Sequence, residues 1–129
     1  MKRSVSGRAE LGGDRRSVGK AGEEIACKYL EEHGFIIQGR NWRTRSGELD
    51  IIARHGKATV FVEVKARRSK SFGRPEESVT PDKARRIRRL ATEYLASAAH
   101  SPEVRFDVIS LMLDPDNNLL ELHYIPDAF

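Results

Sequence analysis

The chain has 129 residues, the size of one domain, and a formal net charge of +4 at pH 7. Its one cysteine, Cys27, excludes an internal disulfide, and no Cys/His cluster has the spacing of a zinc finger. No apolar run approaches the roughly 20 residues of a membrane span, and no apolar secretory signal opens the chain. We therefore expect a soluble, cytoplasmic protein without a membrane partner.

The positive charge is concentrated in one part of the chain. Residues 40–89 hold 15 Lys and Arg against 6 Asp and Glu, a net charge of +9, so the remainder carries −5. A concentrated basic region suits a polyanionic partner such as nucleic acid, which is bound through its phosphates. A solvated basic face is an equally good explanation of the charge alone.

The N-terminal part of the chain divides into an arm and a helix. Residues 1–18 mix Gly, Ser and Arg without apolar periodicity, which predicts a flexible basic arm ahead of a domain at 19–129. The domain is expected to begin with a helix over residues 19–33, with Gly34 placed to cap its C-terminus.

Five strands and a second helix are predicted after this helix. The first strand begins near residue 35, and the next two run over 48–53 and 59–66, which are rich in β-branched and aromatic residues. Beyond a basic loop, Thr80 as N-cap and Pro81 at the first helical position predict the second helix. Two more strands follow. The order α-β-β-β-α-β-β predicts one α/β domain with a mixed five-stranded sheet flanked by helices.

Three charged residues, Asp50, Glu63 and Lys65, lie inside the second and third predicted strands. An unpaired carboxylate in an apolar setting costs several kcal/mol, so buried carboxylates are normally paired or bound to a metal ion. Glu63 and Lys65 are two residues apart and therefore share one face of their strand. Together with Asp50 they form the candidate catalytic site.

The turn between these two strands decides whether Asp50 reaches Glu63. A four-residue loop pairs Arg54 with Thr59 and places Asp50 opposite Glu63. A two-residue loop sets the two acids diagonally on one face, whereas a three-residue loop puts them on opposite faces.

Two neighbouring carboxylates repel each other unless one keeps its proton or a cation binds both. Oxygen ligands favour Mg²⁺ or Mn²⁺, which can activate water for phosphodiester hydrolysis while Lys65 orients that water or stabilises the transition state. Glu23 completes the ligand set if the first helix packs beside these strands, and Glu24 replaces it if the helix is rotated. The alternatives are an exposed ion pair between Glu63 and Lys65 and, for Glu23, a contact with the helix dipole.

At these residues the chain resembles the PD-(D/E)xK nuclease superfamily, with Asp50 in the first acidic position and Glu63-Val64-Lys65 in the second. Successive segments also resemble motifs of the uncharacterised bacterial YraN family, namely Gly22-Glu23-Glu24-Ile25-Ala26, Arg40-Asn41-Trp42-Arg43, Gly47-Glu48-Leu49-Asp50, Val62-Glu63-Val64-Lys65, Phe72-Gly73-Arg74-Pro75 and Val79-Thr80-Pro81-Asp82-Lys83. The resemblance implies a restriction-endonuclease-like fold, similar to that of archaeal Holliday-junction resolvases, with Glu23, Asp50, Glu63 and Lys65 as the active-site set. It also implies a homodimer that acts on branched DNA.

The basic region supplies the residues expected to bind phosphates. They lie in the loop after the third strand and on the polar face of the second helix, where the alternative is a solvated surface. The set is Arg67, Arg68, Lys70, Lys83, Arg85, Arg86 and Arg89. Trp42 is either a stacking platform for an unpaired base or a packing residue, and the role of Glu48 is open.

The sequence thus predicts a metal-dependent endonuclease that hydrolyses DNA and prefers branched or single-stranded substrates. The alternative is a non-catalytic nucleic-acid-binding accessory protein in DNA processing that retains a nuclease-like fold. In a third hypothesis the acids and the lysine form only a structural network in an interaction module. The substitution Asp50→Asn separates the three, because it acts on cleavage in the first, on neither cleavage nor binding in the second, and on stability in the third.

Overall fold

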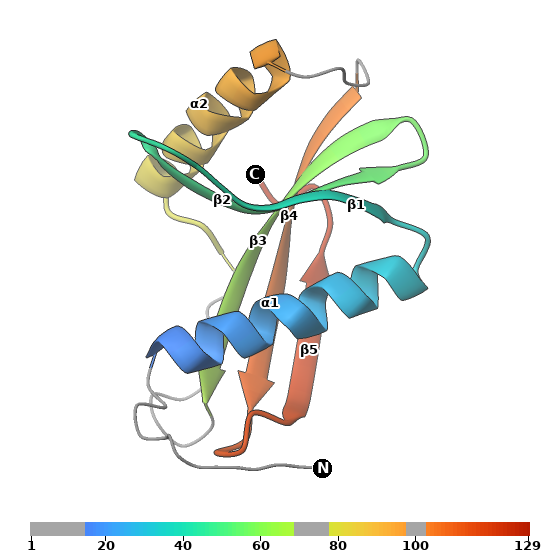
Figure 1. Cartoon of the computed structure of the whole chain (residues 1–129), viewed down its shortest axis with the longest axis vertical. Coiled ribbons are helices and arrows are strands. Elements are labelled where there is room, and N and C mark those ends of the chain that lie inside the picture. Colours follow the sequence, from blue (N-terminus) through green and yellow to red (C-terminus); the bar gives the residue numbers. More distant parts are fainter. Residues whose placement is uncertain (1–14, 69–77, 98–102) are drawn as a thin grey trace.

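The computed structural model describes residues 15–68, 78–97 and 103–129 (Figure 1). Its elements are α1 (Arg15–Glu32), β1 (Ile36–Thr44), β2 (Gly47–His55), β3 (Ala58–Arg68), α2 (Pro81–Ser97), β4 (Glu103–Leu113) and β5 (Leu119–Ile125). The strands form one five-stranded sheet in the order β1-β2-β3-β4-β5. Only β3 and β4 pair in parallel. The predicted order and the mixed sheet of a single α/β domain are confirmed, and the arrangement is consistent with a nuclease-like fold.

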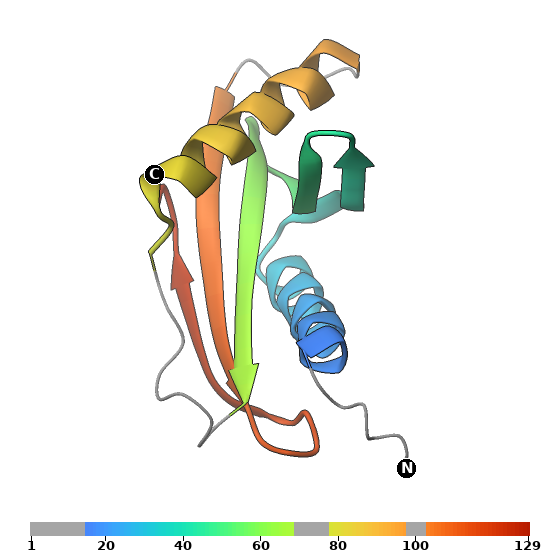
Figure 2. The same ribbon diagram turned by 90° about the vertical axis from the view of Figure 1, so that its left-hand side faces the viewer.

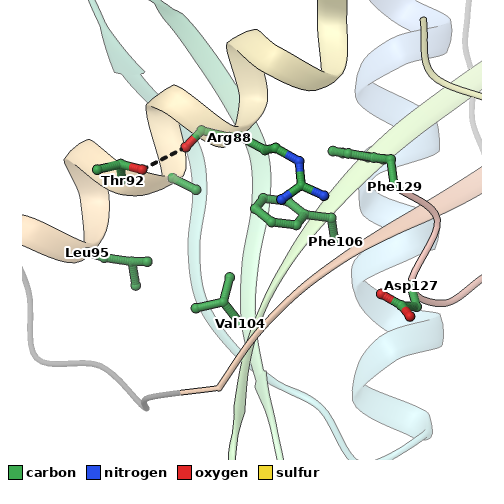
Figure 3. A pocket seen from close by; sticks show the side chains of 8 residues that line it. Arg88, Thr92, Leu95, Val104, Phe106, Asp127 and Phe129 are labelled. Atoms are coloured by element: carbon green, nitrogen blue, oxygen red, sulfur yellow. Dashed lines mark hydrogen bonds between the residues drawn. The ribbon is translucent and has the colours of Figure 1, made fainter. Parts of the chain in front are cut away.

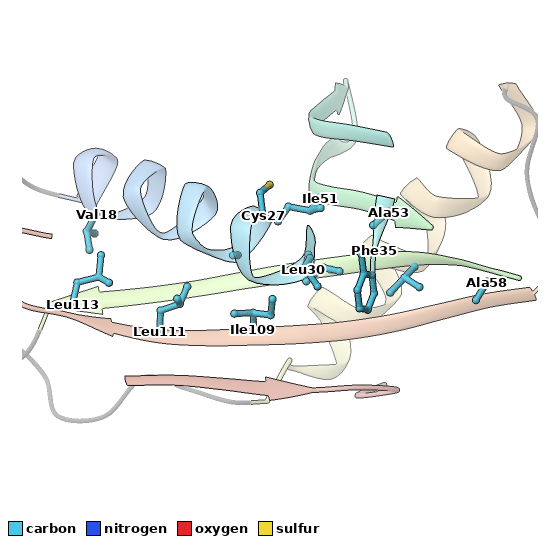
Figure 4. Packing of buried hydrophobic residues seen from close by; sticks show 13 residues of the cluster. Val18, Cys27, Leu30, Phe35, Ile51, Ala53, Ala58, Ile109, Leu111 and Leu113 are labelled. Carbon is cyan, nitrogen blue, oxygen red and sulfur yellow. The ribbon is translucent and has the colours of Figure 1, made fainter. Parts of the chain in front are cut away.

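The two helices cover opposite faces of the sheet (Figure 2). Alternate residues of β3 separate the faces, because Val60 and Val62 pack in the cluster beneath α1 whereas Phe61 packs in the cluster beneath α2. The α1 cluster contains Leu30 at its centre and Leu111 from β4 (Figure 4). Neither helix in the described part of the chain is long and apolar enough to cross a membrane.

Helix α1 begins at Arg15, four residues before the start that the sequence predicted. The physical reason is Val18, which is 9% exposed and packs in the α1 cluster near Leu113 (Figure 4). Burying this side chain extends the helix backwards into a segment whose composition favours a loop. The rest of the expected flexible arm, residues 1–14, lies outside the described residues.

Gly22 marks the closest approach of α1 to the sheet. A Cβ atom at this position would lie 2.6 Å from Ala66 Cβ and 3.4 Å from Leu111 Cδ1. Gly22→Ala is therefore expected to destabilise the protein by about 1–3 kcal/mol, because the helix must move off the sheet. Urea unfolding measures this change. Gly19→Ala is the matched control, since nothing lies within 4 Å of its new Cβ and the helix interior favours alanine by about 0.5–1 kcal/mol. Equal effects of both substitutions would contradict the close packing at Gly22.

The β2–β3 hairpin has the register that brings Asp50 toward Glu63. Arg54 pairs with Thr59, as the four-residue loop predicted, but His55 also pairs with Ala58, so the turn itself contains only residues 56 and 57. Gly56 at its first position has φ +61°, the left-handed conformation that a type II′ hairpin turn requires there.

Strand β2 leaves β3 immediately before the acidic residues meet. The β2–β3 pairing extends only to Ile51 and Val62, whereas β2 continues to pair with β1 as far as Gly47. Figure 2 shows this part of the hairpin turned away from β3. Leu49 explains the bend, because it is 2% exposed and packs in the α2 cluster instead of the α1 cluster that holds Ile51.

Candidate active site

Asp50 lies where β2 separates from β3. Its carboxylate serves as the hydrogen-bond acceptor for the β3 backbone at a point where β2 no longer pairs with β3. Its Oδ2 atom accepts a hydrogen bond from the Val64 backbone N–H at 2.9 Å. The carboxyl group is also hydrogen-bonded to the Glu63 side chain. Sequence reasoning expected Asp50 and Glu63 to meet, and the structure brings them together.

The pKa of Asp50 is raised to about 8. The largest cause is burial, and the negative charge of Glu63 is the next. The hydrogen bond from Val64 favours the ionised form, but it does not offset these two effects. At neutral pH Asp50 therefore holds the proton that it shares with Glu63.

Glu63 is the buried anion of the site, and its ion-pair partner comes from the next helix. Lys83 Nζ lies 2.8 Å from Glu63 Oε2, and the Glu63 side chain is only 8% exposed. Burial of Lys83 acts to lower its pKa, but the hydrogen bond and charge of Glu63, aided by the charge of Asp50, raise it overall. Lys65 is half-buried on the same face of β3 as Glu63. Two lysines therefore belong to this part of the protein, Lys83 in an ion pair with Glu63 and Lys65 two residues along the same strand face.

Sequence reasoning assigned Lys83 to phosphate binding and missed its contact with Glu63. The two residues are 20 positions apart on different elements, so no local pattern links them. The only local feature that bears on the position of Lys83 is the predicted helix start at Thr80. In the structure Thr80 Oγ1 accepts a hydrogen bond from the Lys83 backbone N–H at 3.2 Å. This cap fixes the first turn of α2, on which Lys83 lies, but only the tertiary structure shows that this turn reaches β3.

The structure distinguishes Glu23 from Glu24. Glu23 is half-buried on α1, and its charge is close enough to raise the pKa of Asp50. Burial in turn raises the pKa of Glu23, against a hydrogen bond from Asn41 that lowers it. Glu24 is exposed and forms an ion pair with Arg40 at 3.2 Å. Of the two glutamates, Glu23 is therefore the one beside the acid pair.

The donor atoms present fit a divalent cation held by two protein ligands. Within the described residues no group of three or more His, Cys, Asp or Glu side chains is gathered closely enough to hold a metal ion. Glu23 is an electrostatic neighbour of the acid pair, and its role as a third metal ligand stays a prediction. Asp50 and Glu63 would supply the one or two carboxylates that Mg²⁺ typically uses, with water and phosphate oxygens as its other ligands.

The basic residues expected to bind phosphates fall into separate groups. Arg85, Arg86 and Arg89 are exposed on α2, and Arg85 forms an ion pair with Asp82. Arg67 and Arg68 are half-buried at the end of β3. Lys70 lies outside the described residues.

Arg68 has a structural role that the sequence did not reveal. Its Nη2 atom donates hydrogen bonds to Asn117 Oδ1 at 2.9 Å and to Ser17 Oγ at 3.4 Å. These bonds connect β3 to the start of α1 and to the β4–β5 turn. They leave α2 as the principal exposed basic surface among the described residues that were expected to bind phosphates.

Two other residues near the hairpin have identified contacts. The ring of Trp42 packs edge-on against that of Tyr94, with 5.5 Å between the centroids, so it joins β1 to α2 as a packing residue. Glu48 forms an ion pair with Arg43 at 3.2 Å, and its charge also raises the pKa of Glu23, after burial as the main cause.

A cavity of about 330 Å³ lies beside α2 (Figure 3), and neither residue of the acid pair lines it. Arg88 and Phe106 form its wall, with the guanidinium carbon 4.6 Å from the ring centroid. Thr92, Leu95 and Asp127 also line the cavity. None of the residues predicted to be catalytic or to bind phosphates borders it.

The fold and the site define a single-domain mixed α/β protein with a hydrogen-bonded carboxylate pair and an ion-paired lysine where two strands separate. The chain belongs to the uncharacterised protein family UPF0102, whose family model matches residues 22–111. This range contains the acid pair and both lysines.

Relatives in this family are similar over most of their length. A UPF0102 protein of Leifsonia xyli subsp. xyli is 46% identical over 110 residues, which cover 84% of this chain and 92% of that protein. A UPF0102 protein of Dictyoglomus turgidum is 41% identical over 117 residues, covering 90% and 99%. One of Symbiobacterium thermophilum is 49% identical over 115 residues, covering 88% and 97%.

Proposed function

We propose that this protein is a divalent-metal-dependent endonuclease that hydrolyses phosphodiester bonds in DNA. The observation that carries the proposal is the contact between Asp50 and Glu63 inside the protein, in which burial and the charge of Glu63 raise the pKa of Asp50 so that it keeps its proton. A cation at this position would allow both groups to ionise. The resemblance of the surrounding motifs to the PD-(D/E)xK superfamily supports the same function.

The residues have separate roles in this reaction. Asp50 and Glu63 would hold Mg²⁺ or Mn²⁺, which when bound supplies an activated water and offsets negative charge on the phosphate. Lys65, two residues after Glu63 and on the same face of β3, orients the attacking water or stabilises the charge that develops on the phosphate oxygens. Arg86 and Arg89, exposed on α2, hold the neighbouring phosphates of the strand.

The proposed substrate is branched or single-stranded DNA, cut in the cytoplasm by a homodimer. This part of the proposal is supported by the motif resemblance to archaeal Holliday-junction resolvases. The exposed arginines of α2 are suited to a phosphate backbone and carry no sign of base recognition.

A non-catalytic nucleic-acid-binding accessory protein is the second candidate. One observation favours it, because protein groups already satisfy the Glu63 carboxylate, through the ion pair with Lys83 and the hydrogen bond to Asp50. In that case the acid pair serves the structure and the arginines of α2 alone bind nucleic acid, with an affinity that falls as the salt concentration rises.

A cleavage assay on DNA substrates of different shape tests the proposal. The wild-type protein is incubated with labelled single-stranded, duplex, flap and four-way-junction DNA in Mg²⁺, Mn²⁺ or EDTA. Asp50→Asn removes a proposed metal ligand and is expected to lower the cleavage rate at least roughly 100-fold while DNA affinity is retained. Asp116→Asn, an identical charge change at an exposed turn residue, should cleave like the wild type. Binding without metal-dependent cleavage on every substrate would favour the accessory protein.

A further inference from the structure

We infer that Lys83 is a built-in counter-ion of the acid pair, which a divalent cation displaces and which then turns to the phosphate of the bound nucleic acid. The inference rests on the proposed function, because it concerns the same carboxylates. It makes Lys83 a positioning residue that couples the arrival of the cation to the binding of substrate.

The contact between Lys83 and Glu63 is asymmetric, and this asymmetry permits displacement. The Glu63 side chain is 8% exposed and fixed on β3, whereas the Lys83 side chain is 41% exposed. The ammonium thus reaches the buried carboxylate from the solvent side. It can leave by rotation of its own flexible stem, since the contact involves the side chain of Lys83 and no backbone pairing of the sheet.

The backbone of Lys83 is held by the cap of α2, whereas its side chain is partly exposed and is held by the ion pair with Glu63. Thr80 caps the first turn of α2 by accepting the Lys83 N–H at Oγ1, and its carbonyl accepts the Ala84 N–H at 2.8 Å. Val79, just before the cap, packs in the α2 cluster. The ammonium group therefore stays within one side-chain length of the acid pair after it leaves Glu63.

A cation and Lys83 compete for the same negative charge. The ammonium lies 2.8 Å from a Glu63 oxygen, so it would oppose a second positive charge bound to that carboxylate. The like charge of Arg86 acts to lower the pKa of Lys83, against the overall rise that Glu63 causes. The released ammonium and Arg86 together present positive charge where a phosphate would approach the cation.

A titration of the protein with Mn²⁺ in the absence of nucleic acid tests this competition. Free Mn²⁺ is followed by electron paramagnetic resonance for the wild type and for Lys83→Met, Lys83→Gln and Lys83→Arg. Removing the competing charge in Lys83→Met is expected to tighten Mn²⁺ binding about tenfold. Lys83→Gln keeps a hydrogen-bond donor for Glu63 but removes the charge, so it should also bind Mn²⁺ more tightly. It replaces Lys83→Met in the test if the methionine variant does not fold. Lys83→Arg, which keeps the charge, should bind like the wild type.

The controls separate this inference from the proposed function. Lys57→Met makes the same charge change at the exposed β2–β3 turn and should leave Mn²⁺ affinity unchanged. If neither the wild type nor any Lys83 variant binds Mn²⁺ at Asp50 and Glu63, the metal site itself is overturned, and the proposed endonuclease with it. If the wild type binds Mn²⁺ but the methionine and glutamine variants bind no more tightly, only the role of Lys83 is overturned.

A cleavage measurement completes the test. At saturating Mn²⁺ the loss of the phosphate contact in Lys83→Gln is expected to weaken DNA binding and raise KM about tenfold, although the cation binds more tightly. A lysine that only stabilised the fold would leave both Mn²⁺ affinity and KM unchanged in the folded variant, and this result would overturn the inference.

Discussion

At pH 8 in EDTA, Asp50→Asn is expected to raise the free energy of unfolding by several kcal/mol. The folded protein holds the Asp50 carboxyl at a pKa of about 8, with burial as the main cause and the charge of Glu63 as the second. In the unfolded chain the same group titrates near pH 4. Asparagine mimics the protonated acid, because it can accept the Val64 N–H and donate to Glu63.

The sign of the pH dependence follows from these two pKa values. Below about pH 4 both the folded and the unfolded chain hold the Asp50 proton, so this group contributes its full stability there. Between about pH 4 and pH 8 only the folded protein holds it, and stability falls with rising pH by at most about 1.4 kcal/mol per pH unit. Asparagine has no proton to release, so the substitution removes this slope.

Urea unfolding of both proteins from pH 5 to pH 9 measures the effect, with Asp116→Asn as the control for an exposed acid. The difference in free energy of unfolding between Asp50→Asn and the wild type should increase as the pH rises. Mg²⁺ should decrease this difference, because it stabilises the wild type alone. A variant that is less stable than the wild type at every pH would show that the ionised carboxylate stabilises the fold, contrary to the raised pKa of Asp50.

Asp107→Ala is expected to cost about 3–5 kcal/mol of stability, since it leaves a buried network without its anion. Asp107 on β4 is fully buried, and its two carboxylate oxygens accept the Arg105 guanidinium at 2.9 Å each. The Tyr124 hydroxyl on β5 and the Asp127 backbone N–H also donate to it. One side chain therefore ties two strands and the last residues of the chain together.

The measurement is the free energy of unfolding in urea, compared with that of Asp107→Asn and Asp116→Ala. Asparagine keeps the size and one acceptor oxygen but loses the charge, so its cost should be smaller. Asp116 is exposed in the β4–β5 turn, and its loss should change stability by less than about 0.5 kcal/mol. A cost below about 1 kcal/mol for Asp107→Ala would mean that water replaces the carboxylate in this network.

The elements and their order were predictable because their signals are local. The β-branched strand runs, the cap at Thr80 and the helical spacing after Pro81 depend on neighbours in sequence. The register that brings Asp50 to Glu63 was also among the predicted alternatives, because it requires only one short turn.

Other features depend on contacts between residues far apart in the sequence, so local sequence patterns did not predict them. The start of α1 is set by where Val18 packs, and the bend of β2 by the contact of Leu49 with the α2 cluster. The pairing of Lys83 with Glu63 requires the path between β3 and α2. The burial of Asp107 could have been predicted from the sequence, because Asp107, like Asp50, is a charged residue within an apolar strand.

The separation of β2 from β3 means that the two carboxylates of the acid pair are held by different parts of the structure. Asp50 belongs to a hairpin end that packs on α2 through Leu49, whereas Glu63 is held by the β3–β4 ladder. In an uninterrupted ladder the two carboxylates would be locked at the spacing of neighbouring strands. Here the main-chain pairing has already ended at Ile51 and Val62, so the spacing of the two carboxylates is set by the packing of Leu49 and by the hydrogen bond from Val64 to Asp50 instead of by the ladder.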